Sequence, residues 1–236
     1  MNKYQKIINN IINDIETKES SNIKEAAKIF LNAIKKEEVI HVFATGHSHM
    51  FAEELFYRAG GIVQIDPILK PFLMQHEGAI SSTKYERLSG IAKIIYEGLD
   101  LKKGEPFVIV SNSGVNSVPI EMAQLVKENG HPLIVVTSMD TSKNINKEKH
   151  LYDYADVLID NHTSYGDASI QTKYGNIAPT STIASAYIAN RIVIDTISMC
   201  EEEGISPSIY MSANIGGDDH NKELVKKYRQ RIKGLN

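Results

Sequence analysis

The sequence lacks the features that mark secreted, membrane-spanning and disulfide-stabilised proteins. Its 236 residues include one cysteine, Cys200, so no disulfide can form within the chain. Cys200 lies in an apolar helical stretch, where we expect a packed thiol rather than a reactive one. No apolar run reaches the roughly 18–20 residues of a membrane-spanning helix, and the first residues lack the apolar core of a signal peptide. We therefore expect a cytoplasmic protein that does not associate with membranes.

The sequence also has no excess of basic over acidic residues. The chain carries 26 Lys and Arg against 29 Asp and Glu, a net charge of −3, which gives no electrostatic footprint for nucleic acid. An anionic ligand must therefore be held by local groups. The contents of hydrophobic (42%) and charged (23%) residues are those of a globular protein, and the length suits one domain over residues 1–236. Within it, residues 1 to about 36 form an N-terminal helical extension.

Strands alternate with helices along most of the chain. Short apolar runs predict strands at residues 39–44, 62–65, 107–110, 132–137 and 155–160. Helical periodicity covers residues 3–36, 50–59, 84–99, 120–128 and 179–203, with a last helix near the C-terminus. Residues 66–84 are irregular, and residues 161–178 are predicted to form a long polar loop. This order predicts an α/β fold with right-handed crossovers and a parallel sheet.

Residues 107–117 are the part of the sequence most typical of a ligand site. Four apolar residues predict a buried strand, and small hydrogen-bonding residues follow it: Ser111, Asn112, Ser113, Gly114, Asn116 and Ser117. Pro119 fits the first turn of a helix. The free N–H groups of that turn, the helix dipole and the hydroxyls would converge on a phosphate or carboxylate. An ordinary serine-rich turn with a helix cap is the alternative interpretation.

A second turn of the same kind favours a ligand site over two unrelated polar turns. Residues 45–49 follow the first predicted strand and contain Gly46, His47 and Ser48 before another helix. Ligands of open parallel sheets bind beyond the carboxyl ends of the strands, where both turns would lie. We therefore predict that Gly46, His47 and Ser48 contribute to the same site as residues 111–117.

These motifs resemble those of the SIS (sugar isomerase) family of phosphosugar-binding domains, over roughly residues 20–220. The resemblance rests on residues 44–48 (Ala-Thr-Gly-His-Ser) and on residues 111–116, which match the family pattern Ser-x-Ser-Gly-x-Ser/Thr at Ser111 and Ser113. Position 116 departs from the pattern, with Asn in place of Ser or Thr. Residues 52–61 and the Gly-Gly-Asp-Asp-His-Asn segment near the C-terminus look closest to the branch named UPF0309, or to phosphoheptose isomerase-like proteins.

Membership would imply a three-layer, flavodoxin-like sandwich with a five-stranded parallel sheet. It would also imply phosphate binding by the hydroxyls and amides of residues 111–117, no cofactor, and a homo-oligomer, dimer or tetramer, whose sites are completed by a neighbouring subunit. The chemical partner would be a phosphorylated sugar or amino sugar.

Catalytic groups must be sought outside the phosphate loop. In phosphoheptose isomerases, a His and a Glu four residues apart on one helix serve in catalysis and can hold zinc. His49 and Glu53 have that spacing, whereas matching the Ala-Glu-Glu-Leu segment selects Glu54. We keep both carboxylates as candidates for the base. A metal at His49 and Glu53, with His47 nearby, is a weaker hypothesis because no fourth ligand is evident.

Three further residues could act as acid or base. His76 and Glu77 would do so if their irregular loop folds over the sugar, and they would be surface residues otherwise. His220 could be oriented by neighbouring aspartates, which could equally cap a helix. Thr180 and Ser181 open the longest apolar helix, as ligand donors or as caps.

The resemblance leaves the reaction open. Phosphoheptose isomerases carry a catalytic His about three turns into the helix that begins near residue 180, and this chain has Asn190 and Arg191 there. We expect an aldose–ketose isomerase acting on a sugar or amino-sugar phosphate. The alternatives are a lyase (etherase) acting on a substrate like N-acetylmuramic acid 6-phosphate and a non-catalytic phosphosugar sensor. The N-terminal helices lack the basic recognition face that a DNA-binding sensor would need.

Overall fold

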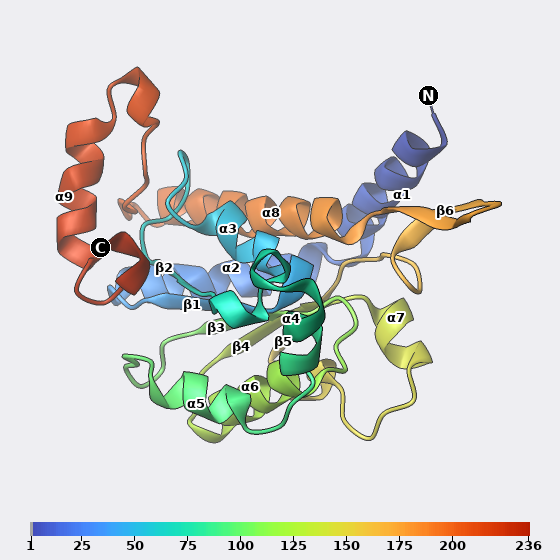
Figure 1. Cartoon of the computed structure of the whole chain (residues 1–236). Coiled ribbons are helices and arrows are strands. Elements are labelled where there is room, and N and C mark those ends of the chain that lie inside the picture. Colours follow the sequence, from blue (N-terminus) through green and yellow to red (C-terminus); the bar gives the residue numbers. More distant parts are fainter. Residues whose placement is uncertain (1) are drawn as a thin grey trace.

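The computed structural model describes residues 2–236 and is built on a five-stranded parallel sheet (Figure 1). The strands are β1 (Ile40–Ala44), β2 (Ile65–Ile68), β3 (Phe107–Val110), β4 (Leu133–Thr137) and β5 (Val157–Asp160). Their order in the sheet is β2-β1-β3-β4-β5, which places β1 and β3 side by side near the centre. Every residue of β1, β3 and β4 is buried, because helices cover both faces of the sheet.

Alternate residues of each strand enter two separate apolar cores. On one face, Val42 and Val108 pack with α1 (Lys3–Lys18), α2 (Ser20–Lys35), α3 (Met50–Leu55) and α8 (Ser181–Glu202). On the other face, Phe43 and Ile109 pack with α5 (Ile91–Glu97) and α6 (Ser117–Glu128). Figure 1 shows the resulting three layers, with the sheet in the middle. This architecture confirms the predicted sandwich.

The helix periodicity of the N-terminal segment reflects direct packing against the sheet and α8. Ile23, Ala26 and Phe30 are fully buried on one side of α2, whereas Ile11 and Ile15 are the buried residues of α1. The side chain of Asn2 caps α1 by accepting from the Gln5 backbone N–H at 2.8 Å. Burial of an amphipathic face is what stabilises helices of this length.

Three local predictions were wrong. The expected helix over residues 84–99 is two helices, α4 (Ala79–Tyr85) and α5, because Gly90 adopts a left-handed φ of 89° between them. The expected strand at residues 62–65 is β2 at Ile65–Ile68, and it tolerates Pro67 because it is an edge strand. The helix expected to reach residue 59 ends at Leu55, where Phe56 is extended and Tyr57 has a positive φ.

The expected polar loop at residues 161–178 contains an antiparallel hairpin. Its strands are β6 (Ala168–Thr172) and β7 (Gly175–Pro179), and it projects beside the N-terminal end of α8 (Figure 1). The tyrosine hydroxyl of Tyr4 in α1 donates to Pro179 O at 2.7 Å. The residues of β6 are mostly half-buried and those of β7 mostly exposed, so the alternation of buried and exposed residues that would reveal a strand in the sequence is missing.

The C-terminal segment packs at the edge of the sheet where the strands begin. α9 (Asp218–Tyr228) and the chain after it place Tyr228 and Ile232 on Val39 and Val63, which precede β1 and β2. A short helix, α7 (Met139–Asn144), follows β4. None of the helices formed by residues 2–236 is both long and apolar enough to cross a bilayer.

Candidate functional site

The turns after β1 and β3 lie next to each other, because these two strands are hydrogen-bonded neighbours that run in the same direction. Thr45 and Gly46 leave β1 and begin a 3₁₀ turn (Gly46–His49) that leads into α3. Ser111 leaves β3 and begins the loop that leads into α6. The sheet therefore brings together the two turns that the sequence indicates as ligand-binding.

The loop after β3 is shaped by its own hydrogen bonds. Ser111 Oγ accepts from the backbone N–H of Gly114 at 3.2 Å, and Thr137 Oγ1 donates to the Ser111 carbonyl at 2.7 Å. Gly114 has a φ of 63°, and a Cβ at this position would lie 2.8 Å from Thr137 Oγ1 and 2.9 Å from Ser142 Oγ. Only glycine fits both the backbone conformation and the space. The hydrogen bond between Ser111 and Gly114, and the close packing at Gly114, thus fix the conformation of the loop.

The N-terminus of α6 is not capped by its own chain. Asn116 occupies the N-cap position, but its side chain accepts no hydrogen bond from the helix. In the described residues no protein acceptor faces the backbone N–H groups of Ser113, Val115, Asn116 and Ser117, or the Ser113 hydroxyl. By contrast, the Ser138 side chain caps α7. Unpaired N–H groups at the positive end of a helix dipole form a site for an anion.

The other polar side chains of this loop are engaged in positioning it. Asn112 Oδ1 accepts from Asn161 Nδ2 at 2.8 Å and from Thr163 Oγ1 at 3.1 Å, which ties the loop to the chain that follows β5. Ser117 Oγ donates to the Arg87 carbonyl at 2.9 Å. Among the polar side chains of residues 111–117, Ser113 is therefore the one that makes no hydrogen bond with other described residues, and its hydroxyl and the backbone N–H groups can donate to a ligand.

Glu86 joins the two turns, and the sequence gives no indication of this role. Its carboxylate accepts from Thr45 Oγ1 at 2.9 Å and from Asn116 Nδ2 at 2.8 Å, and its carbonyl accepts from the Val118 backbone N–H at 3.0 Å. Burial raises the pKa of Glu86, and the hydrogen bond from Thr45 opposes that rise. An isolated Glu between two helices matches no motif. The amide of Asn116, which stands where the family pattern has Ser or Thr, is thus engaged with Glu86.

The loop before α4 lies against the turn after β1. Gln75 Nε2 lies 3.0 Å from His47 Nδ1, and the rings of His49 and His76 are 6.0 Å apart between centroids. The structure thus brings His76 and its neighbour Glu77 to the edge of the predicted site, although both side chains are exposed. Nδ1 of His49 faces the Gly46 carbonyl. Among residues 2–236, no three His, Cys, Asp or Glu side chains are grouped to hold a metal ion.

The start of α8 also reaches the turn after β1. Ser181, Thr182 and Ser185 share a small cavity of about 10 Å³ with His47 and Ser48. However, Asp167 occupies the helix N-terminus: its carboxylate accepts from the backbone N–H groups of Thr180 at 2.9 Å and Ser181 at 2.8 Å, and from the Ser181 hydroxyl at 2.6 Å. Thr180 is fully buried. In this structure both residues serve the helix cap.

The two candidate carboxylates of α3 differ in their surroundings. Glu53 is exposed, whereas Glu54 faces α8 and has 19% of its side chain exposed. Glu54 Oε1 accepts from Asn190 Nδ2 at 2.8 Å, and Oε2 accepts from Arg58 at 2.5 Å. Asn190 therefore sits beside the carboxylate at the place where the resemblance leads one to look for a histidine.

His220 is the one predicted catalytic residue that lies away from this group. It belongs to α9, and its Nε2 lies 2.9 Å from the carbonyl of Ile209, which pairs with Ile62 ahead of β2. That position is at the edge of the sheet where the strands begin. His220 therefore does not converge with the turns at the strand ends.

Comparisons with known proteins show the family of the chain. A model of the SIS domain matches residues 3–138. A UPF0309 protein of Thermoanaerobacter pseudethanolicus is 40% identical over 235 residues, covering 95% of each chain. A UPF0309 protein of Geobacillus kaustophilus is 38% identical over 240 residues, covering 98% of this chain and 95% of that protein.

Among solved structures, a phosphoheptose isomerase from Francisella tularensis superposes with a TM-score of 0.57 at 10% identity. That superposition covers 82% of this chain and 94% of the other, and at this identity it shows a shared fold. The matched domain and the relatives identify the chain as a member of the SIS-domain family, in the branch that carries the name UPF0309.

Proposed function

We propose that the protein binds a phosphorylated sugar or amino sugar and interconverts its aldose and ketose forms. The supporting observation is the open N-terminus of α6, where the Ser113 hydroxyl and the backbone N–H groups of residues 113 and 115–117 have no acceptor among the described residues. A phosphate dianion can accept several such hydrogen bonds at once, and the helix dipole favours its charge. Membership of the SIS family supports the same ligand.

Isomerisation requires a base next to the carbon that carries the acidic proton, beside the carbonyl of the open-chain sugar. With the phosphate fixed at α6, the far end of the sugar would extend toward the turn after β1 and helix α3. Glu54 is our first candidate for the base, because α3 directs it toward α8 and Asn190 contacts it at 2.8 Å. Glu53, His76 and Glu77 remain candidates on the exposed side of the same region.

Asn190 suggests that the reaction differs from that of phosphoheptose isomerases, which have a catalytic histidine in this part of the helix. An amide cannot exchange a proton in the way an imidazole does, so the chain must complete the reaction with another acid or act on a different substrate. The alternatives are a lyase that eliminates across C2 and C3 of a muramic acid phosphate and a sensor that binds the ligand without turnover. The sensor is supported by Glu54, because both of its carboxylate oxygens are already hydrogen-bonded.

A second copy of the chain is the partner we propose for the outer face of α8. Ile183 and Ile194 are 41% and 53% exposed there, and Met50 of α3 is 44% exposed beside the small cavity at the start of α8. Large apolar side chains gathered on one helix favour an interface. Such a homo-oligomer would bring a neighbouring subunit close to Glu53, Glu54 and the turn after β1.

The test is a thermal-shift panel with glucose 6-phosphate, glucosamine 6-phosphate, fructose 6-phosphate, N-acetylmuramic acid 6-phosphate and the corresponding free sugars. We expect at least one phosphorylated sugar to raise Tm, because a ligand that binds the folded state stabilises it, while its free sugar does not. NMR of each binding sugar phosphate then reports conversion to its isomer, or elimination. A panel in which no phosphorylated sugar shifts Tm contradicts the proposal.

A further inference from the structure

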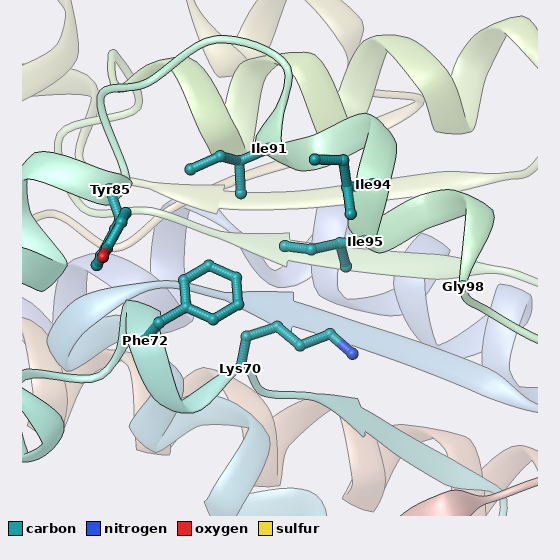
Figure 2. Close-up of a pocket in the computed structure, with 7 residues that line it drawn as sticks. All are labelled: Lys70, Phe72, Tyr85, Ile91, Ile94, Ile95 and Gly98. Carbon is teal, nitrogen blue, oxygen red and sulfur yellow. The ribbon is translucent and has the colours of Figure 1, made fainter.

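A second hollow lies on the other face of the sheet from α8, between the loop after β2 and helix α5. Its volume is about 540 Å³, and it is lined by Lys70, Phe72, Tyr85, Ile91, Ile94, Ile95 and Gly98 (Figure 2). Hollows of this size are typical of sites for small molecules. It is much larger than the cavity of about 10 Å³ beside His47, although the polar groups of the candidate active site lie at the strand ends and not here.

The lining is almost entirely apolar and partly exposed. Ile94 is 74% exposed, Phe72 41% and Tyr85 40%, and the rings of Phe72 and Tyr85 meet edge to face at 5.6 Å. Figure 2 shows Phe72 between Tyr85 and Lys70, with the isoleucines of α5 on the opposite side. Covering this surface with an apolar group would remove it from water, which is favourable.

Lys70 adds a positive charge to the hollow. Its aliphatic stem lines the floor (Figure 2), and within the described residues no carboxylate lies within 4.0 Å of its ammonium group. Two cations of neighbouring segments, by contrast, are paired: Lys93 lies 3.8 Å from Glu97, and Arg231 lies 3.2 Å from Asp100. A single unpaired cation beside an apolar surface is complementary to a molecule with an apolar body and one anionic group.

We propose that this hollow binds a small amphiphilic anion, with its apolar body between Phe72, Tyr85 and the isoleucines of α5 and its anionic group on Lys70. A sugar phosphate does not fit this chemistry, because the Tyr85 hydroxyl and the Lys70 ammonium are the only polar side-chain groups that residues 2–236 contribute to the lining. The site is separate from the N-terminus of α6, so its occupancy does not depend on the function proposed above.

The experiment titrates the wild-type protein with 8-anilinonaphthalene-1-sulfonate, whose aromatic body and sulfonate match the hollow, and follows its fluorescence. We expect saturable binding that octanoate displaces and octan-1-ol displaces at least tenfold more weakly. Lys70→Met, which keeps the stem, should weaken probe binding about tenfold, the scale of a lost hydrogen bond to a charged group. Ile94→Glu should weaken it by at least as much.

The control variants distinguish binding in this hollow from binding elsewhere on the protein. Ile215→Glu, at an isoleucine that is 79% exposed ahead of α9 and does not line the hollow, should leave binding unchanged, as should Ser113→Ala and an excess of inorganic phosphate. Circular dichroism and Tm establish that each variant is folded, because unfolded or molten states also bind the dye. Absence of saturable binding, or binding by Lys70→Met and Ile94→Glu equal to that of the wild type, overturns the proposal. So does a wild-type dimer that Ile94→Glu dissociates, since a second copy would then fill the hollow.

Discussion

Ser113 is the polar side chain of the loop after β3 that makes no hydrogen bond with the other described residues. Ser111, by contrast, uses its oxygen to accept from Gly114, and Ser117 donates to Arg87. The family motif by itself does not distinguish the roles of these hydroxyls. Their hydrogen bonds show that Ser111 and Ser117 take part in shaping the loop, whereas Ser113 does not.

Ser113→Ala should therefore weaken binding of a phosphorylated sugar by about 1.5–3 kcal/mol, the usual scale for a hydrogen bond to a charged group. Isothermal titration with the sugar phosphate that raises Tm most provides the measurement. The matched control is Ser198→Ala, at an exposed serine of α8. Equal affinities in the wild type and Ser113→Ala would remove the hydroxyl from the phosphate site.

The base is the second question at this scale. If the protein is an isomerase, replacing the right carboxylate by glutamine should lower turnover by about 10²–10⁴ while leaving phosphate binding nearly intact. Exchange of the C2 proton of the bound sugar with deuterated solvent, followed by NMR, reports the step directly. We expect exchange to be lost in Glu54→Gln and retained in Glu53→Gln.

Glu86→Gln serves as the comparison variant for this experiment. Glu86 orients Thr45 and Asn116, so its replacement should weaken binding of the sugar phosphate rather than abolish exchange in the bound state. Exchange that survives in both variants of α3 would exclude that helix and direct attention to His76 and Glu77. No exchange or conversion with any sugar phosphate that binds would favour the sensor.

At the scale of elements, three helices that follow strands differ in how their N-termini are satisfied. Ser138 caps α7 and Asp167 closes α8, whereas α6 is left open because Asn116 turns its amide to Glu86. A free helix N-terminus is unfavourable unless something else accepts from it. The contrast between α6 and α8 is the reason to place the anion at α6.

Asp167→Ala should destabilise the protein by about 1–2 kcal/mol, because it removes the acceptor for two backbone N–H groups and a carboxylate at the positive end of α8. Urea denaturation measures the free energy of unfolding. Glu148→Ala, at an exposed acidic residue, should change it little. Unchanged stability of Asp167→Ala would show that the cap is not made in solution.

At the scale of the whole molecule, a buried ionic cluster holds the C-terminal segment to the sheet. The two ring nitrogens of His41 lie 2.9 Å from Asp66 Oδ2 and 3.2 Å from Glu105 Oε2, and Arg231 donates to Glu105 at 2.9 Å. Both ring nitrogens face carboxylates, so the arrangement favours the doubly protonated imidazolium.

Stability should consequently depend on pH through His41. Burial lowers the pKa of His41, but hydrogen bonds to Asp66 and Glu105 outweigh it and raise the pKa above its ordinary value. Because the folded-state pKa exceeds the unfolded one, this stabilisation is complete below about pH 6.5 and is lost as pH rises through the folded-state pKa. Unfolding free energies from urea titrations at about pH 6 to 9 should therefore fall with pH.

Glu105 determines how far the stabilisation by the same cluster extends to low pH. Burial raises its pKa, yet hydrogen bonds from His41, the backbone of Lys102 and Val39, and Arg231 lower it to about 2. Its contribution is present above its unfolded pKa and disappears as pH falls toward about 2. The His220→Gln variant should keep the whole profile, because His220 lies outside the cluster. A profile that is flat across the alkaline half of the titration would contradict a charged His41.

Assembly is the remaining prediction at this scale. We expect light scattering at micromolar concentration to return a dimer or tetramer for the wild type, and Ile194→Glu to shift it toward monomer by placing a charge in the α8 interface. Ile94→Glu, on the other face of the sheet, is the matched control and should not change the mass. A wild-type monomer would remove both the oligomer and any site shared between subunits.

The sequence predicted most of the fold because the relevant signals are local. Short apolar runs marked β3, β4 and β5, and the period of α2 and α8 marked their buried faces. Where packing supplied no alternation, as in the hairpin of β6 and β7, or where Gly90 split a helical period in two, the prediction failed.

The sequence by itself determined that a small, hydroxyl-rich loop with glycine at position 114 follows a buried strand, because strand burial and loop chemistry are written in consecutive residues. Tertiary structure decided which donors of that loop stay free. That outcome depends on Glu86, which lies 30 residues from Asn116 and 41 from Thr45 and contacts both only when β1 and β3 pair and α4 ends beside them. Hydrogen bonds between distant residues form only in the folded chain, so no local pattern can reveal which groups they leave for a ligand.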